Sequence, residues 1–162
     1  MADKGGDRIM ELKNRSQYLD KLISVQDMEV IKVVTGIRRC GKSSLLKLMM
    51  AHLREQGVME EQILSMNFES MQFADMDSKS LYQYVTERES KGKRLYLFLD
   101  EVQKVRDWQD AVNSFRVDLD CDIYVTGSNA YLLSSELSTY LSGRYVAVSY
   151  THLRAHETVL DL

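Results

Sequence analysis

Residues 36–43 read Gly36-Ile37-Arg38-Arg39-Cys40-Gly41-Lys42-Ser43. This is the phosphate-binding loop pattern, in which a glycine, four residues, a second glycine and a lysine are followed by serine or threonine. The flanking sequence fits that pattern, because residues 30–35 form a β-branched run typical of a buried strand and apolar residues recur at helical spacing over residues 45–53. The sequence therefore predicts a strand, a phosphate-binding loop and a helix, in that order.

The residue types in this segment suit an anion-binding loop. Gly36 and Gly41 let the backbone curl so that successive N–H groups point inward, and the helix that begins near Lys42 adds the positive end of its dipole. Lys42 is expected to contact the β- and γ-phosphates of ATP, and the Ser43 hydroxyl is expected to ligate Mg²⁺. The predicted nucleotide-binding residues are Gly36, Ile37, Arg38, Arg39, Cys40, Gly41, Lys42, Ser43 and Ser44.

Two arginines stand at variable positions of the loop. The favoured interpretation of Arg38 and Arg39 is solvated charge, because exposed charges usually contribute little. Contact with phosphate or with a neighbouring subunit is the alternative. Cys40 lies beside Lys42, and the positive charge together with the helix start should favour its thiolate.

A second segment supports the first. Residues 94–99 are almost continuously apolar, as in a central parallel strand that is buried on both faces, and they are followed by Asp100 and Glu101. Because side chains alternate along a strand, we expect the two carboxylates to point to different sides. Asp100 is assigned to the Mg²⁺ shell and Glu101 to the activation of the attacking water.

A third strand is expected to end in polar residues near the same place. Residues 122–129 read as a strand followed by a turn, and the carboxyl ends of parallel strands share the edge at which ligands bind. Asn129 could therefore reach the γ-phosphate or the attacking water. The alternative role for Asn129 or Ser128 is the N-cap of a helix over residues 130–142.

From Ile31 to Tyr145 the chain resembles bacterial and archaeal AAA-type ATPases that usually carry a nuclease-like domain at their C-terminal end. The resemblance rests on the loop segment through Leu46, on Asn67-Phe68-Glu69, on Leu99-Asp100-Glu101-Val102-Gln103 followed by Trp108, and on residues 126–145. It implies that Lys42 and Ser43 belong to the Walker A motif, that Asp100 and Glu101 belong to Walker B, and that Asn129 with Ser128 forms the sensor position. It further implies that the strands ending at Asp100 and Gly127 flank the loop strand.

These observations predict an α/β P-loop NTPase fold, a three-layer α/β/α sandwich with a mainly parallel five-stranded sheet. Residues 1–29 are predicted to be an N-terminal helical segment and residues 30–147 the ATPase core, truncated on its C-terminal side. Residues 148–162 are interpreted as a non-native tail, because residues 148–158 look like the in-frame translation of a sequencing adapter. A nuclease-like domain would then be missing in cis.

Composition limits the function without adding chemistry. The chain has 162 residues, with 21 basic and 24 acidic side chains, so that one domain is expected and no global nucleic-acid footprint is present. It shows neither a signal-peptide pattern nor a transmembrane run. Two cysteines form no disulfide framework, and a reducing cytoplasm is the expected location.

The sequence favours an Mg²⁺-dependent ATPase, with Glu101, Lys42 and Asn129 as catalytic residues and ATP and Mg²⁺ as cofactors. Arg144 is a candidate for a charge-stabilising finger toward a neighbouring subunit of a homo-oligomer. Two alternatives stay open. A nucleotide-operated switch would bind ATP with little hydrolysis, and a P-loop kinase would need an acceptor pocket in place of an activated water.

Overall fold

The computed structural model describes residues 4–36, 41–128, 141 and 144–149. In chain order the helices and strands are α1 (Lys4–Ser24), β1 (Ile31–Gly36), α2 (Lys42–Glu55), β2 (Ile63–Asn67), α3 (Ser78–Thr86), β3 (Leu95–Asp100), α4 (Trp108–Asp118), β4 (Cys121–Ser128) and β5 (Tyr145–Ser149). Three short 3₁₀ helices lie at Glu60–Gln62, Met71–Phe73 and Val102–Lys104. The predicted strand and helix on either side of the loop are thus present as β1 and α2, and residues 37–40 lie outside the described residues.

The five strands form one parallel sheet in the order β2-β3-β4-β1-β5. The α/β class and the five-stranded parallel sheet are therefore confirmed. Of the two expected neighbours of β1, β4 is confirmed and β3 is wrong. β1 pairs with β4 and β5, and β4 separates it from β3. Periodicity could not have given this order, since β1 and β3 are both buried along their whole length and show no alternation of buried and exposed residues that would distinguish one neighbour from another.

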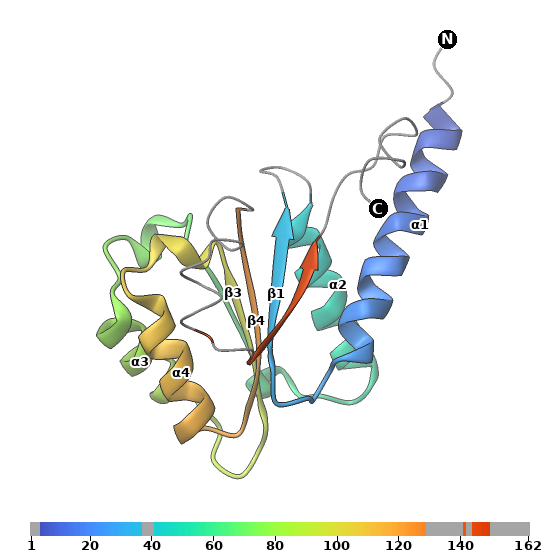
Figure 1. The fold of residues 1–162 in the computed structure, drawn as a ribbon. Helices are drawn as coiled ribbons and strands as arrows, with labels where there is room; N and C mark the ends of the chain where they lie inside the picture. The colour runs from blue at the N-terminus through green and yellow to red at the C-terminus, as the bar shows by residue number, and fades with distance from the viewer. Residues whose placement is uncertain (1–3, 37–40, 129–140, 142–143, 150–162) are drawn as a thin grey trace.

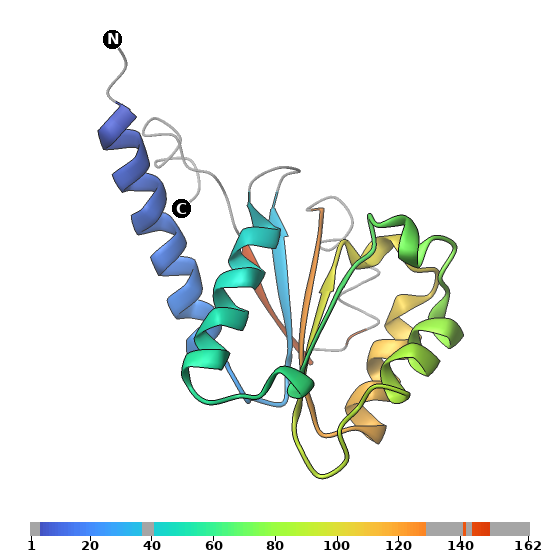
Figure 2. The same ribbon diagram turned by 180° about the vertical axis from the view of Figure 1, so that it is seen from behind.

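Helices cover both faces of the sheet, as Figures 1 and 2 show from opposite sides. α3 and α4 pack on one face, where their apolar side chains join Val33, Leu97 and Val125 in one core cluster. α1 and α2 cover the other face, where Phe98 and Tyr124 belong to a second cluster. The alternation of side chains along each strand thus supplies two cores and gives the predicted three layers.

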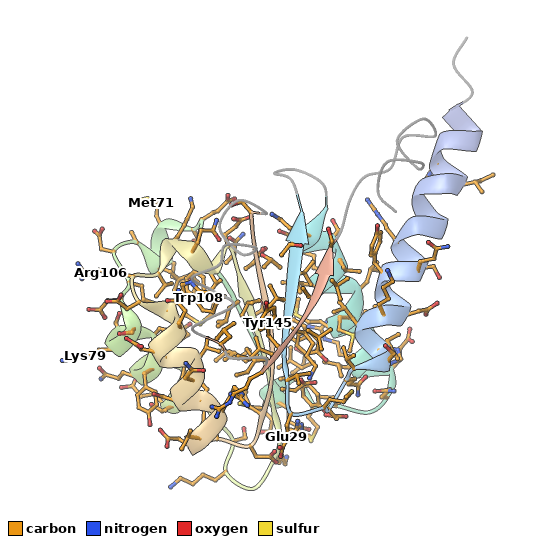
Figure 3. All side chains as sticks on the ribbon, viewed as in Figure 1. Glu29, Met71, Lys79, Arg106, Trp108 and Tyr145 are labelled. Carbon is orange, nitrogen blue, oxygen red and sulfur yellow. The ribbon has the colours of Figure 1, made fainter. Side chains whose placement is uncertain are left out.

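Trp108, labelled in Figure 3, is the first residue of α4 and is fully buried in the α3/α4-side cluster. This placement is that of a core anchor. Asp107 precedes α4 with a left-handed φ of 57°, and its side chain forms no capping bond. The α3 helix is capped by Asp77, because the Asp77 carboxylate accepts the Ser80 N–H while the Ser80 hydroxyl accepts the Asp77 N–H.

The edge strand β5 extends further than the sequence indicates. The predicted ATPase core ends at residue 147, yet β5 continues to Ser149, with Val148 buried opposite Val34 and Ser149 opposite Thr35. Residues 150–162 of the predicted non-native tail lie outside the described residues. The helix expected over residues 130–142 also falls almost entirely outside them.

Candidate nucleotide site

Because all five strands are parallel, their carboxyl ends share one edge of the sheet, the upper edge in Figure 1. α2 begins at that edge, directly after Gly41, which adopts a left-handed conformation with φ 95°. This conformation is one that glycine reaches without strain, so Gly41 suits the sharp entry into the helix. No side chain caps α2, and its first turn contains no acidic residue. The N–H groups of this helix start, which no side chain caps, and the helix dipole favour an anion.

Lys42, the first residue of α2, is almost fully buried and ties three elements together. Its ammonium donates to the Gly36 carbonyl at the end of β1 (3.0 Å) and to the Gly127 carbonyl near the end of β4 (2.9 Å). It also lies 3.6 Å from Oε1 of Glu101. The ammonium therefore stands where β1, β3 and β4 end.

Ser43 and Asp100 are joined directly. The Ser43 hydroxyl lies 2.5 Å from Oδ2 of Asp100, at hydrogen-bond distance. The other carboxylate oxygen, Oδ1, accepts a hydrogen bond from the Thr126 hydroxyl on β4. Asp100 is only 6% exposed, so its charge is held by these hydroxyls in a largely dry position.

Glu101 follows β3 in a left-handed backbone conformation, with φ 58° and ψ 50°. For a residue with a side chain this conformation costs on the order of 1–3 kcal/mol. Its N–H donates to the Thr126 hydroxyl (2.9 Å), and its Oε2 accepts from Nε2 of Gln103 (2.5 Å). Because the strand ends at Asp100, the expected alternation does not extend to Glu101, and both carboxylates reach the start of α2.

A cavity beside Lys42 is lined by Lys42, Glu69, Glu101, Gln103, Lys104 and Ser128. The sequence prediction assigned no role to Gln103 or Thr126 in this site. Gln103 lies two residues after Glu101, inside the segment on which the family resemblance rests, so its position was a usable signal. The position of Thr126 in this site follows only from the pairing of β3 with β4.

The remaining predicted residues divide into two groups. Gly36 and Gly41 border the loop, and Ser44 is half-buried in the first turn of α2. Outside the described residues lie Ile37, Arg38, Arg39, Cys40 and Asn129. The sensing role of Asn129 and the contacts of the two arginines therefore stay predictions.

Arg144 lies away from the site of its own chain. Its carbonyl accepts the N–H of Ile31, at the beginning of β1, whereas the loop follows the end of that strand. Five steps along a strand span roughly 16 Å. If Arg144 stabilises charge at a nucleotide site, that site would therefore belong to a neighbouring copy of the chain, as the sequence analysis predicts.

The donor set fits Mg²⁺ that arrives with a nucleotide. Ser43 and Asp100 supply a hydroxyl and a carboxylate, which are hard oxygen donors, and Mg²⁺ is usually bound through one or two carboxylates together with substrate phosphates and water. Among the described residues there is no group of three or more His, Cys, Asp or Glu side chains that could hold a metal ion by itself. In the same part of the chain no helix is long and apolar enough to cross a membrane.

The fold and the loop define a protein of the P-loop NTPase class. The family model described as an AAA domain matches residues 29–159, which is most of the chain, and the chain belongs to that family. A relative in Haemophilus influenzae, described as an uncharacterized protein, is 44% identical over 137 residues. That alignment covers 83% of this chain and 34% of the relative.

A second relative, from Methanocaldococcus jannaschii and also described as uncharacterized, is 28% identical over 137 residues, covering 83% of this chain and 30% of its own length. The chain thus spans about a third of the length of these curated relatives.

Solved structures share the fold at low sequence identity. A structure described as Drosophila ORC bound to AT-rich DNA and Cdc6 matches with a TM-score of 0.64 and 12% identity, over 93% of this chain and 58% of that one. A DNA polymerase III gamma subunit-related protein from Thermotoga maritima matches with a TM-score of 0.57 and 11% identity, over 82% and 45%. These likenesses concern the fold alone.

Proposed function

We propose that this domain binds ATP with Mg²⁺ and hydrolyses the terminal phosphoanhydride bond. The observation that carries the proposal is the meeting of Lys42, Ser43, Asp100 and Glu101 at the start of α2. These residues come from two segments that lie 57 positions apart in the sequence. Family membership supports the same chemistry.

Each residue has a distinct task in this proposal. Lys42 neutralises charge on the phosphates, and Ser43 with Asp100 holds the metal ion, which would offset the charge that develops during phosphoryl transfer. Glu101 orients and deprotonates the attacking water. Its distance of 3.6 Å from Lys42 keeps the base next to the group that would contact the phosphates.

A switch that binds nucleotide and hydrolyses it slowly is the second candidate. The observation that favours it is the engagement of both Glu101 oxygens, Oε1 with Lys42 and Oε2 with Gln103. A base held by two protein groups is less available to water. Turnover close to zero in a chain that binds ATP well would support this candidate.

The proposal on partners is more limited. We expect ATP and ADP as ligands, a homo-oligomer in which Arg144 reaches a neighbouring site, and a further C-terminal domain in cis. The DNA named with the Drosophila structures belongs to those proteins, and the near balance of basic and acidic residues in this chain gives nucleic-acid binding no support.

Two variants of the full chain test the function. Lys42→Ala should weaken the binding of Mg-ATP itself, because it removes the ammonium at the phosphates. Glu101→Gln keeps the shape of the side chain and should leave binding intact while turnover falls by about 10²–10⁴-fold. The matched controls are Lys47→Ala, at an exposed position on the same helix, and Glu55→Gln, at the exposed last residue of that helix.

Binding would be measured by calorimetry and turnover by phosphate release. Equal loss of binding in Lys42→Ala and Glu101→Gln would remove Glu101 from the role of base. Undiminished binding in Lys42→Ala would argue against the loop as the nucleotide site.

A further inference from the structure

Thr126 and Asp100 meet because of the register between β3 and β4. Phe98 pairs with Tyr124 in this register, and the two rings stack with centroids 4.7 Å apart. Both rings belong to the core cluster on the α1/α2 face. Two residues further along each strand, alternation places Asp100 and Thr126 on the same face, toward the start of α2.

The Thr126 hydroxyl forms two hydrogen bonds with different halves of the site. It donates to Oδ1 of Asp100 and accepts the Glu101 N–H at 2.9 Å. Thr126 is fully buried, and a hydroxyl at a buried position is costly unless it is hydrogen-bonded. Here the donor and one acceptor position of the hydroxyl are both used, and both partners belong to the predicted Walker B pair.

Two consequences follow for the carboxylates. Asp100 is held at both ends, at Oδ2 by Ser43 and at Oδ1 by Thr126, so that rotation of its carboxylate would break a buried hydrogen bond. Glu101 has its left-handed backbone tied to β4 through its N–H. One hydroxyl therefore fixes the side chain of one acid and the backbone of the next.

We propose that Thr126 is a positioning residue, which orients Asp100 toward the metal ion and holds the turn that directs Glu101 into the site. It acts through these two residues and need not touch the nucleotide. The inference rests on the proposed function, since it assigns Thr126 a part in the same site. Residues that orient metal-binding groups typically contribute about 10–100-fold to metal affinity or activity.

The test compares Thr126→Val, which keeps the shape and removes the hydroxyl, with Thr126→Ser, which keeps the hydroxyl. In the full chain, ADP binding is measured by calorimetry without metal and across a Mg²⁺ titration. Thr126→Val should raise the Mg²⁺ concentration at half-saturation by about 10–100-fold and leave metal-free ADP affinity unchanged. Thr126→Ser should restore the wild-type Mg²⁺ dependence. Turnover should fall in Thr126→Val and recover in Thr126→Ser.

The matched control is Thr86→Val, which removes a hydroxyl that donates to the Tyr82 carbonyl in α3, outside the site. It should leave the Mg²⁺ dependence unchanged. If Thr126→Val does not fold, Thr126→Ala makes the same comparison. An unchanged Mg²⁺ half-saturation in the hydroxyl-free variant, or a Thr126→Ser variant as impaired as it, would overturn the proposal. A wild-type chain that binds no Mg-ADP would instead refute the proposed function, and the positioning role with it.

Discussion

A buried ion pair at the edge of the sheet opposite the loop makes a sharp prediction about stability. Lys32 on β1 and Asp122 on β4 form a salt bridge in which both side chains are 0% exposed. The ammonium also donates to the Met28 carbonyl (2.7 Å). Asp122 further accepts the Tyr124 hydroxyl (2.8 Å) and the Asp27 N–H (3.0 Å). Lys32→Met would leave the carboxylate buried without its counter-charge.

Breaking one side of a buried pair typically costs about 3–5 kcal/mol. We expect the lower end here, about 3 kcal/mol, because Asp122 keeps two donors and a hydrogen bond to a charged group is worth about 1.5–3 kcal/mol. With a urea m-value of about 1–3 kcal/mol/M, the unfolding midpoint should fall by about 1–3 M. Trp108, the single tryptophan, is fully buried and reports unfolding by fluorescence.

The matched control is Lys93→Met, which breaks the surface ion pair with Glu61. Those side chains are 43% and 48% exposed, so that the loss should be about 0–1 kcal/mol. Combining Lys32→Met with Asp122→Asn removes both charges and keeps an acceptor, so the double variant should be more stable than Lys32→Met alone. A loss in Lys32→Met no larger than that in Lys93→Met would refute the reasoning.

Burial and the hydrogen bond to Asp27 raise the pKa of Tyr96 from 10.0 to about 12, so the folded state keeps a proton that the unfolded chain loses. Stability should therefore fall as pH rises from 10 toward 12, and Tyr96→Phe should reduce this loss of stability in urea unfolding, while Tyr124 and Cys121, whose pKa values are also raised, keep their share of it. Burial raises the pKa of the Cys121 thiol to about 11, so iodoacetamide should modify Cys121 more slowly than Cys40. Mg-ADP should protect Cys40 from modification. Peptide mass spectrometry measures the extent of modification at each cysteine. Trp108→Ala should lower the free energy of unfolding by about 3–5 kcal/mol, which unfolding monitored by circular dichroism would measure.

The class of fold was predictable because its signals are local. The loop pattern, the β-branched run before it and the apolar run before Asp100 each lie within a few residues, and β1, α2 and β3 form where they predict. The order of the strands was not predictable in this way. A strand that is buried on both faces reads the same beside any neighbour, and only the fold reveals that β4 lies between β1 and β3.

The residues of the site were likewise predictable where a local motif identifies them, and not where the pairing of strands places them. Lys42, Ser43, Asp100 and Glu101 were identified from motifs, and the structure brings these four together. The prediction that Asp100 and Glu101 point to different sides was wrong, because the backbone of Glu101 is left-handed. A glutamate in the sequence does not by itself indicate that conformation. Thr126 could not be identified as a site residue from the sequence, since its position beside Asp100 depends on the register between β3 and β4 and not on its neighbours in sequence.

The contacts of Lys42 suggest an order of events for the proposed binding of a phosphate beside Glu101. An ammonium has three N–H donors, and two are directed at the carbonyls of Gly36 and Gly127. The third partner, Glu101, lies at 3.6 Å, which is long for a hydrogen bond. We therefore expect a phosphate oxygen to replace Glu101 before it replaces either carbonyl. The Glu101 carboxylate would then keep its hydrogen bond from Gln103, and its freed oxygen would be open to water in the cavity that Glu101 and Gln103 both line.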